Sequence, residues 1–162
     1  MSEAEPPPHR TLIEVRFREV DSYGVAWHGH FVDWLEVARH RFAGHFGFDS
    51  TALLARGIRL PMLELEIEYR HALRFGDLVA IDVEVADDPR KVVAFRYRLT
   101  RVADGKLVAR ARTVQVVQGA DGALRLGWPP ELRPVVEGMR RYEEARAGAP
   151  TASGSEIVKR VP

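Results

Sequence analysis

The spacing of apolar residues predicts an α+β domain, in which an antiparallel β-sheet wraps around one long central α-helix and a further helix lies near the C-terminus. One segment, residues 30–46, repeats apolar residues at three- and four-residue steps, which is the pattern of an amphipathic helix. Several other segments alternate apolar and polar residues, which is the pattern of strands with one wet and one dry face. A helix with a continuous apolar stripe needs a surface to cover, and the sheet supplies that surface.

The first strand is expected over residues 11–20, where Ile13, Val15 and Phe17 alternate with charged residues. A turn follows at residues 21–24. The long helix has an apolar stripe and a glycine well placed to end it. These residues are Phe31, Leu35, Ala38, Phe42, Phe46 and Gly47.

A short second helix is expected over residues 50–55, capped by Asp49 or Ser50. Four strands should then follow, with a hairpin turn at Asp104-Gly105 and another turn at Asp121-Gly122. Their expected places are residues 63–69, 79–85, 93–99 and 107–117. A final helix should span residues 131–146, because Pro129-Pro130 suits the first turn of a helix.

Length and composition indicate one soluble globular domain: 162 residues, 46% of them hydrophobic and 29% charged. Residues 1–10 are expected to form a disordered lead, residues 11–146 the domain, and residues 147–162 a flexible tail. The 24 Lys and Arg nearly balance the 23 Asp and Glu, so the charge offers no case for nucleic acid binding. The chain has no cysteine, which excludes disulfides, thiolate metal sites and a cysteine nucleophile. No apolar run predicts a membrane span, no leader pattern is present, and we expect a cytoplasmic protein.

The turn that begins at Asp21 carries the strongest chemical signal. It places a carboxylate just before a helix, with Gly24 three residues on. Helix N-termini offer unpaired backbone N–H groups and a positive dipole end, which can bind a carbonyl oxygen that gains charge. The carboxylate could attack that carbonyl or activate water against it. The structural alternative is a turn aspartate with a purely local role.

The segment around this turn resembles the signature of the 4-hydroxybenzoyl-CoA thioesterase family, which includes the YbgC-like acyl-CoA thioesterases. The matching residues are Asp21, Gly24, Val25, His28, Phe31, Trp34, Glu36, Ala38 and Arg39. A second segment, residues 69–77, resembles the family's strand-loop element, with Ala72 where proline is usual. The order of elements agrees over residues 12–117. The resemblance implies a hot-dog fold, hydrolysis of an acyl-CoA thioester, and no cofactor beyond the coenzyme A of the substrate.

The resemblance also implies roles for single residues. Asp21 takes the place of the catalytic carboxylate, as nucleophile or general base, in a turn that includes Gly24 and Val25. Backbone N–H groups around Trp27 and His28 take the oxyanion role. His28 could orient water or the thioester, or it could be a helix-entrance histidine with no chemical task. Active sites are expected between the subunits of a homo-oligomer, a dimer or a tetramer.

Substrate contacts are expected from cations and aromatic rings. Arg90 and Lys91 resemble the basic loop that holds coenzyme A phosphates in the family, and Arg70 and Arg74 are further candidates. The aromatic candidates are Tyr23 and Phe31. With Trp27, Trp34 and Phe46, Phe31 could line a pocket for an aryl or medium acyl chain, or these rings could be ordinary core.

Several alternatives remain open. Glu36 is a second candidate carboxylate, because a related hot-dog branch uses a helix glutamate, but it could instead pair with Arg39. No metal is expected, because His28 and His30 alone make a poor site. An α/β-hydrolase is excluded by the lack of a G-x-S-x-G motif, and no hot-dog dehydratase motif is present. The competing function is a non-catalytic module that binds acyl-CoA or an acyl carrier protein.

Overall fold

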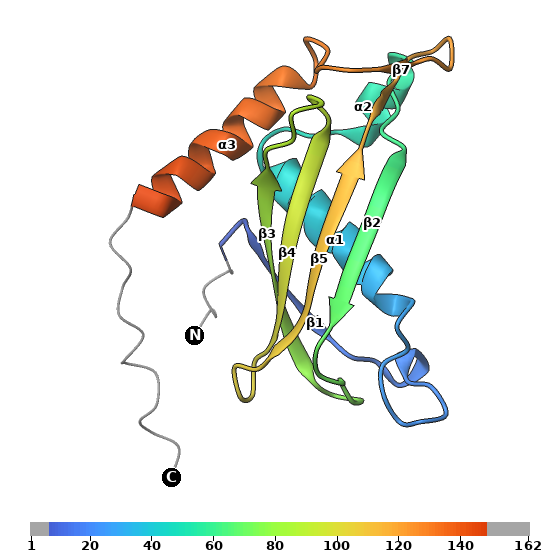
Figure 1. Ribbon diagram of the computed structural model, residues 1–162, viewed down its shortest axis with the longest axis vertical. Helices are drawn as coiled ribbons and strands as arrows, with labels where there is room; N and C mark the ends of the chain where they lie inside the picture. Colours follow the sequence, from blue (N-terminus) through green and yellow to red (C-terminus); the bar gives the residue numbers. More distant parts are fainter. Residues whose placement is uncertain (1–6, 149–162) are drawn as a thin grey trace.

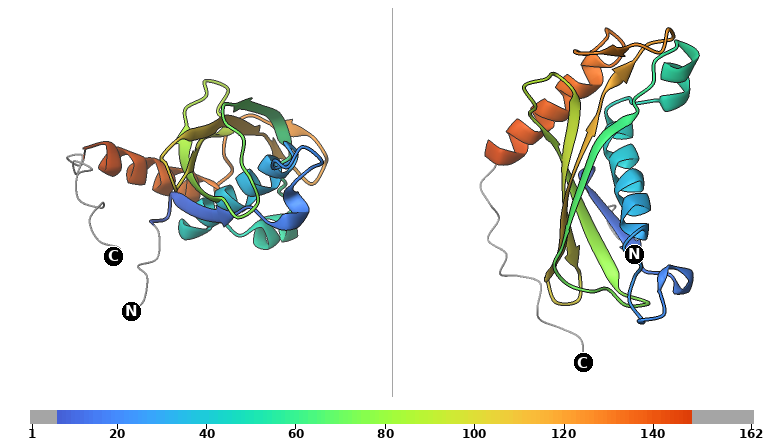
Figure 2. Two further views of the ribbon diagram at one scale, coloured as in Figure 1. Left: turned by 90° about the horizontal axis from the view of Figure 1, so that it is seen from below. Right: turned by 45° about the vertical axis from the view of Figure 1, so that its right-hand side comes forward.

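The computed structural model describes residues 7–148 of the chain. Five antiparallel strands form one sheet in the order β1-β3-β4-β5-β2, and Figure 2 shows this sheet curving around helix α1, His30–His45. The strands are β1 Arg10–Glu14, β2 Met62–Tyr69, β3 Leu78–Ala86, β4 Val93–Arg101 and β5 Leu107–Gln115. The predicted α+β architecture, with a sheet wrapped around one long helix, is therefore confirmed.

The core lies between α1 and the inner face of the sheet. Leu35 and Phe42 on α1 are almost fully buried, as the apolar stripe predicts, and Trp34 is buried beside them. The facing strands contribute inner-face residues at every second position, such as Ile81 on β3 and Leu99 on β4. Burial of these apolar side chains is the main force that holds helix and sheet together.

The shorter elements follow the predicted signals closely. Helix α2, Ser50–Ala55, is capped by Asp49, whose carboxylate accepts hydrogen bonds from the N–H groups of Thr51 and Ala52. Gly47 adopts a φ of +88° just after α1, a conformation that glycine reaches without strain. These signals are local in the sequence, and for that reason they can be interpreted without the tertiary structure.

The C-terminal part closes one end of the barrel-like sheet. Strands β6, Val117–Gln118, and β7, Leu124–Arg125, form a small hairpin around the predicted turn at Asp121-Gly122. Helix α3, Arg133–Gly148, begins two residues later than predicted, after a turn in which the N–H of Leu132 donates to the carbonyl of Pro129. Figure 1 shows α3 beside β3, and its Tyr142 ring meets Phe42 of α1.

The prediction of one strand over residues 11–20 is wrong in its second half. Strand β1 ends at Glu14, which pairs with Leu78, the first residue of β3. Beyond that point β3 offers no partner, and residues Phe17–Glu19 form a turn of 3₁₀ helix, η1. Phe17 is consequently 80% exposed rather than buried. The alternation of residues was strand-like, but the register with β3 decides where the strand stops.

The prediction that one face of β2 is buried is also wrong for the single chain. Leu63 is 50% exposed, and Leu65 and Tyr69 are exposed as well. Strand β2 lies at an edge of the sheet, whereas α1 packs closest to β1 and β3 on the opposite side. The helix therefore leaves Leu63 and Leu65 uncovered, whereas Ile67 packs partly against the core.

Both predicted domain boundaries, at residues 10 and 146, fall within the described part of the chain. Residues 7–10 of the expected lead are described: Arg10 begins β1, and the His9 Nδ1 atom lies 2.7 Å from the Tyr142 hydroxyl. At the other end α3 extends to Gly148, two residues past the expected boundary. Residues 1–6 and 149–162 lie outside the described part. Within residues 7–148, no helix combines the length and the apolar character needed to span a bilayer.

Candidate active site

The turn at Asp21 is held by three hydrogen bonds of its own. The Asp21 N–H donates to the carbonyl of Val25 (2.9 Å), the Gly24 N–H donates to the carbonyl of Asp21 (3.0 Å), and the Tyr23 N–H donates to Oδ1 of Asp21 (2.8 Å). Gly24 has a φ of +75°, which the turn requires. The other carboxylate oxygen of Asp21, Oδ2, accepts no hydrogen bond from residues 7–148, so it remains available to a substrate or a water molecule.

Two backbone hydrogen bonds connect this turn to the rest of the fold. The Ala26 N–H donates to the carbonyl of Leu73 (2.8 Å), in the loop between β2 and β3. The Trp27 N–H donates to the carbonyl of Glu19 (2.8 Å), at the end of η1. The turn is therefore attached on both sides, and its position relative to α1 is well defined.

Glu19 anchors the segment that precedes the turn. Its side chain is 1% exposed and accepts hydrogen bonds from the Arg16 N–H (2.8 Å) and from the indole Nε1–H of Trp34 on α1 (3.2 Å). Burial raises the pKa of Glu19, but the Arg16 and Trp34 hydrogen bonds lower it more, to about 2. The sequence interpretation gave this residue no role, although the alternation of Ile13, Val15 and Phe17 places position 19 on the same strand face as these apolar residues.

The N-terminus of α1 presents unpaired donors next to the turn. The N–H groups of His30, Phe31 and Val32 already donate to the carbonyls of the three preceding residues 27–29. The N–H groups of His28 and Gly29 form no hydrogen bond with any described residue. They lie at the positive end of the helix dipole, where a developing negative charge is stabilised. The Trp27 N–H, predicted for the same task, is instead occupied by Glu19.

Aromatic rings form a wall beside these donors. The Trp27 indole lies against Gly29 so closely that a Cβ atom there would be 2.1 Å from the ring. The Tyr69 hydroxyl donates to the carbonyl of His28 (3.0 Å), and its ring packs edge-on against Phe31 at 5.0 Å. Burial raises the pKa of Tyr69. Tyr69 belongs to residues 69–77, the segment that resembles the family's strand-loop element. This resemblance was the sequence feature that pointed to Tyr69 as part of the site.

The remaining predicted substrate contacts near the turn differ in position. Arg74 adjoins it, because its Nη1 atom lies 3.8 Å from where a Cβ of Gly24 would stand. Arg70 follows β2 and pairs with Glu68. Tyr23 is 86% exposed, whereas Phe31 is buried in the core with only its contact to Tyr69 directed toward the site.

Arg90 and Lys91 lie in the segment between β3 and β4, and the two side chains differ in their partners. The Arg90 guanidinium donates to Asp88 (2.7 Å) and Glu64 (2.5 Å), so its charge is already compensated by two carboxylates. A phosphate at Arg90 would have to compete with these two carboxylates, and the role of Arg90 as a phosphate ligand stays a prediction. Lys91 lines a surface cavity of 790 Å³ whose other cations are Arg125, Arg133 and Arg140.

The second candidate carboxylate, Glu36, pairs with Arg39 one turn along α1, which is the alternative that the sequence offered. Glu36 is fifteen residues from Asp21 in the sequence and lies on α1, whereas Asp21 lies in the turn that precedes this helix. Within residues 7–148, no three side chains of His, Asp or Glu lie together in a way that could hold a metal ion.

Comparison with known proteins shows which families this chain resembles. The chain is 25% identical over 107 residues to the acyl-CoA thioester hydrolase YbgC of Escherichia coli O157:H7, covering 66% of this chain and 79% of the relative. It is 24% identical over 123 residues to the acyl-CoA thioesterase YbgC of Haemophilus influenzae, covering 75% and 88%. The solved structure of Slr0204, a 1,4-dihydroxy-2-naphthoyl-CoA thioesterase from Synechocystis, shares the fold with a TM-score of 0.74 at 15% identity, over 82% of this chain and 97% of that one.

These matches confirm the hot-dog fold and the resemblance to the YbgC-like proteins. The model of the thioesterase-like superfamily matches residues 15–136, a range that begins just before η1 and ends within α3. It therefore includes the Asp21 turn, the whole of α1 and four of the five strands of the main sheet. By this match over most of its length, the chain belongs to the thioesterase-like superfamily.

Proposed function

We propose that this protein is an acyl-CoA thioesterase, which hydrolyses a thioester to a free acid and coenzyme A. One observation carries the proposal. Within the nine residues from Asp21 to Gly29 lie a carboxylate oxygen and two backbone N–H groups that form no hydrogen bond with any described residue. The names of the relatives support the same reaction class.

Asp21 attacks the thioester carbonyl carbon as a nucleophile, or it accepts a proton from the water molecule that attacks this carbon. The carbonyl oxygen gains negative charge as the tetrahedral species forms. The N–H groups of His28 and Gly29 receive this charge, and the loss of one such donor typically slows an enzyme about 10²- to 10³-fold. The Tyr69 hydroxyl fixes the His28 carbonyl and thereby the orientation of this peptide segment.

Coenzyme A brings phosphates that require cations. The cavity lined by Lys91, Arg125, Arg133 and Arg140 is a candidate for them. Arg125 pairs with Asp121 and Arg140 pairs with Asp87, so Lys91 and Arg133 are the cations best suited to bind a phosphate. Arg74, beside the Asp21 turn, is suited to a second polar contact with the substrate. Arg90 is a weaker candidate, because Asp88 and Glu64 both pair with its guanidinium.

The functional unit is a homo-oligomer that pairs through β2. This edge strand exposes unpaired backbone groups and apolar side chains, namely Met62, Leu63, Leu65 and Tyr69. An exposed apolar edge strand is a template for a further strand. An antiparallel pairing of two β2 strands about a two-fold axis gives the backbone N–H and C=O groups of both edges the same hydrogen bonds.

The test is thiol release from short, medium, long and aromatic acyl-CoAs. We expect Asp21→Asn to abolish release while substrate binding is retained, because the amide neither attacks nor accepts a proton. Asp33→Asn is the matched control, since Asp33 is an exposed carboxylate in the first turn of α1. Full activity of the Asp21 variant would refute the assignment. Binding of acyl-CoA without release by the unmodified protein would instead favour a non-catalytic binding module.

A further inference from the structure

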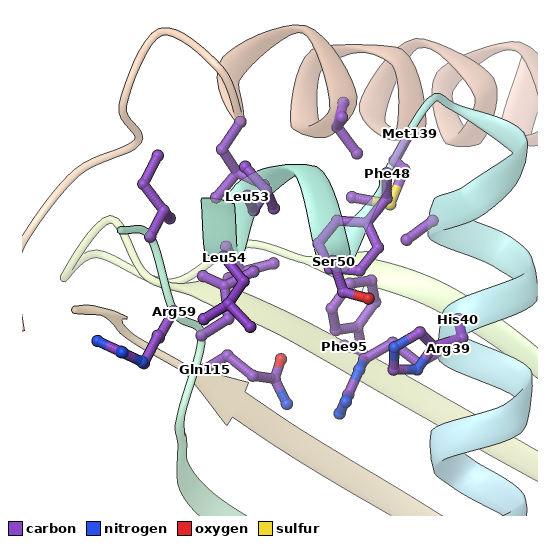
Figure 3. A pocket seen from close by; sticks show the side chains of 16 residues that line it. Arg39, His40, Phe48, Ser50, Leu53, Leu54, Arg59, Phe95, Gln115 and Met139 are labelled. Carbon is purple, nitrogen blue, oxygen red and sulfur yellow. The ribbon is translucent and has the colours of Figure 1, made fainter. Parts of the chain in front are cut away.

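The two faces of the main sheet carry different kinds of hollow. An apolar pocket of 240 Å³ lies on the side of α1, between the C-terminal half of this helix, α2 and α3. Figure 3 shows its side chains, among them Leu53, Phe95 and Met139. On the outer face, which lies in front of α1 in Figure 1, two hollows of 350 and 260 Å³ are lined mainly by charged side chains.

Four arginines form a block on the outer face of the two central strands. Arg96 of β4 stands opposite Arg112 of β5, and these two form the first pair. Arg98 of β4 stands opposite Arg110 of β5, and these two form the second pair. Directly opposite side chains have Cβ atoms only about 5 Å apart, and like charges in such pairs destabilise a sheet. Negative charge beside these pairs therefore stabilises the sheet.

The first pair receives this negative charge from the protein itself. Arg96 donates a hydrogen bond to Glu84 of β3 (2.6 Å). Arg112 donates to Asp88 (2.7 Å) and to Glu64 (3.2 Å). Each arginine of the first pair therefore has a carboxylate partner.

The second pair has no such partner. The carboxylates nearest to it in the register of the sheet are Asp82 on β3 and Glu68 on β2. Asp82 instead accepts two hydrogen bonds from Arg10 (2.7 and 2.8 Å), and Glu68 pairs with Arg70. Among residues 7–148, no carboxylate forms an ion pair with either arginine of the second pair.

The larger hollow gives the second pair a cationic surrounding. Its charged side chains come from β3, β4, β5 and α3, namely Asp82, Glu84, Arg96, Arg98, Arg110 and Arg146. Both acids are already engaged, Asp82 by Arg10 and Glu84 by Arg96. Since four arginines line the hollow against two acids, the lining has an excess of two positive charges.

A phosphate group matches this arrangement in charge and in hydrogen bonding. A phosphate monoester carries a charge of about −1.5 to −2 at pH 7 and has three strong acceptor oxygens. A guanidinium group binds such oxygens with two parallel, charge-assisted hydrogen bonds. Arg98 and Arg110 are both exposed and start from neighbouring Cβ atoms, so both guanidinium groups can reach the same phosphate.

We infer that Arg98 and Arg110 form a binding site for the phosphate group of a small molecule, on the face of the sheet opposite α1. The site is separate from the candidate active site, because the Asp21 turn leads into α1 on the other face. Bound phosphate neutralises the second pair and thereby stabilises the folded sheet.

Calorimetric titration with inorganic phosphate, at a constant ionic strength set with sodium chloride, tests the site. Arg98→Gln and Arg110→Gln should each weaken phosphate binding about tenfold, because each removes one bidentate, charge-assisted contact. Arg98→Lys should have an intermediate effect, since it keeps the charge but loses the fork of donors. Arg18→Gln is the matched control, because Arg18 is an exposed arginine of η1, outside the hollow, and has no carboxylate partner among residues 7–148.

Three results would overturn the inference. The first is no phosphate binding by the unmodified protein. The second is the same affinity in the unmodified protein and in both glutamine variants, which would place the phosphate elsewhere, for example at Lys91 and Arg133. The third is a smaller assembly of Arg98→Gln in sedimentation without phosphate binding by the unmodified protein, which would assign the second pair to an interface between chains.

Thermal unfolding separates a ligand site from a purely structural role. A ligand that binds the folded state raises the Tm, so phosphate should raise the Tm of the unmodified protein and of Arg18→Gln more than that of Arg98→Gln. The general stabilising effect of phosphate as a salt acts on all variants alike and cancels in this comparison. An Arg98→Gln variant with a lower Tm in chloride and the same rise in phosphate would show a structural role and overturn the inference.

Coenzyme A and dephospho-coenzyme A distinguish the two sources of such a phosphate. If Arg98→Gln weakens the binding of inorganic phosphate but not of coenzyme A, the ligand is free phosphate or a small phosphate ester. If it also weakens the binding of coenzyme A, but not of dephospho-coenzyme A, the 3′-phosphate of coenzyme A occupies the site. Either result supports the site, and neither depends on thioester hydrolysis, so the site and the proposed function can fail separately. An equal effect of Arg98→Gln and Arg18→Gln on all three ligands would overturn the inference.

Discussion

Replacing the buried carboxylate of Glu19 by its amide, in Glu19→Gln, should destabilise the protein in a pH-dependent way. Glu19 is 1% exposed, and its pKa is lowered from an ordinary 4.5 to about 2. A difference of this size corresponds to ~3 kcal/mol in favour of the charged form. The Arg16 side chain is 57% exposed, so solvent screens part of the interaction. We therefore expect a loss of about 2 kcal/mol in the free energy of unfolding at pH 7.

The pH dependence follows from the sign of the shift. Because the pKa of Glu19 is lower in the folded state, its contribution is fully present above pH 4.5 and is lost as the pH falls toward 2. Urea unfolding of both proteins, followed by tryptophan fluorescence at pH 7, 5.5, 4 and 3, should show a difference that shrinks below pH 4.5. Glu14→Gln, at an exposed position in β1, is the control. A difference in unfolding free energy below about 0.5 kcal/mol at pH 7 would refute the reasoning, because it is well under the usual value of a charged hydrogen bond. A difference that stays constant with pH would also refute it.

Three further predictions concern the candidate site and the sheet edge. Tyr69→Phe keeps the ring against Phe31 but loses the hydrogen bond to the His28 carbonyl. Urea unfolding should therefore show that the free energy of unfolding falls by about 1 kcal/mol. An unchanged free energy would mean that the bond is absent in solution. Gly29→Ala should displace the Trp27 indole, which a Cβ atom would contact at 2.1 Å, and an unchanged tryptophan emission maximum would contradict this contact. Leu65→Arg places a charge on the exposed inner face of β2, and sedimentation should show a smaller assembly than that of the unmodified protein; an unchanged assembly would mean that the chains join elsewhere.

The secondary structure could be predicted well wherever its signals are local. The Asp49 cap of α2, the glycine after α1 and the alternation in β3 and β4 depend on neighbouring residues, and all of them appear as predicted. The end of β1 could not be predicted in this way, because it depends on where β3 begins more than sixty residues later. The exposure of β2 likewise depends on its place at the sheet edge, far from α1.

The candidate site shows the same division. The turn at Asp21 was predictable, since its hydrogen bonds join residues within four positions of one another. The Glu19 carbonyl, which occupies the Trp27 N–H, could not be predicted from the pattern, nor could the acidic partners of Arg90. Glu64 is distant from Arg90 in the sequence, and only the folded sheet brings their side chains together.

The sequence by itself determined the α+β class, the order of its elements, the turn that holds Asp21 and the resemblance to a thioesterase family. The class, the order of elements and the turn follow from the periodicity of apolar residues and from short-range backbone preferences, which act before any tertiary contact forms. The resemblance rests on the matching residues around Asp21. Only the tertiary structure decided which N–H groups have backbone partners, which cations pair with carboxylates, and that an apolar pocket opens at the far end of α1. Each of these depends on contacts between distant segments, because hydrogen-bond partners and enclosed volume are properties of packing rather than of local pattern.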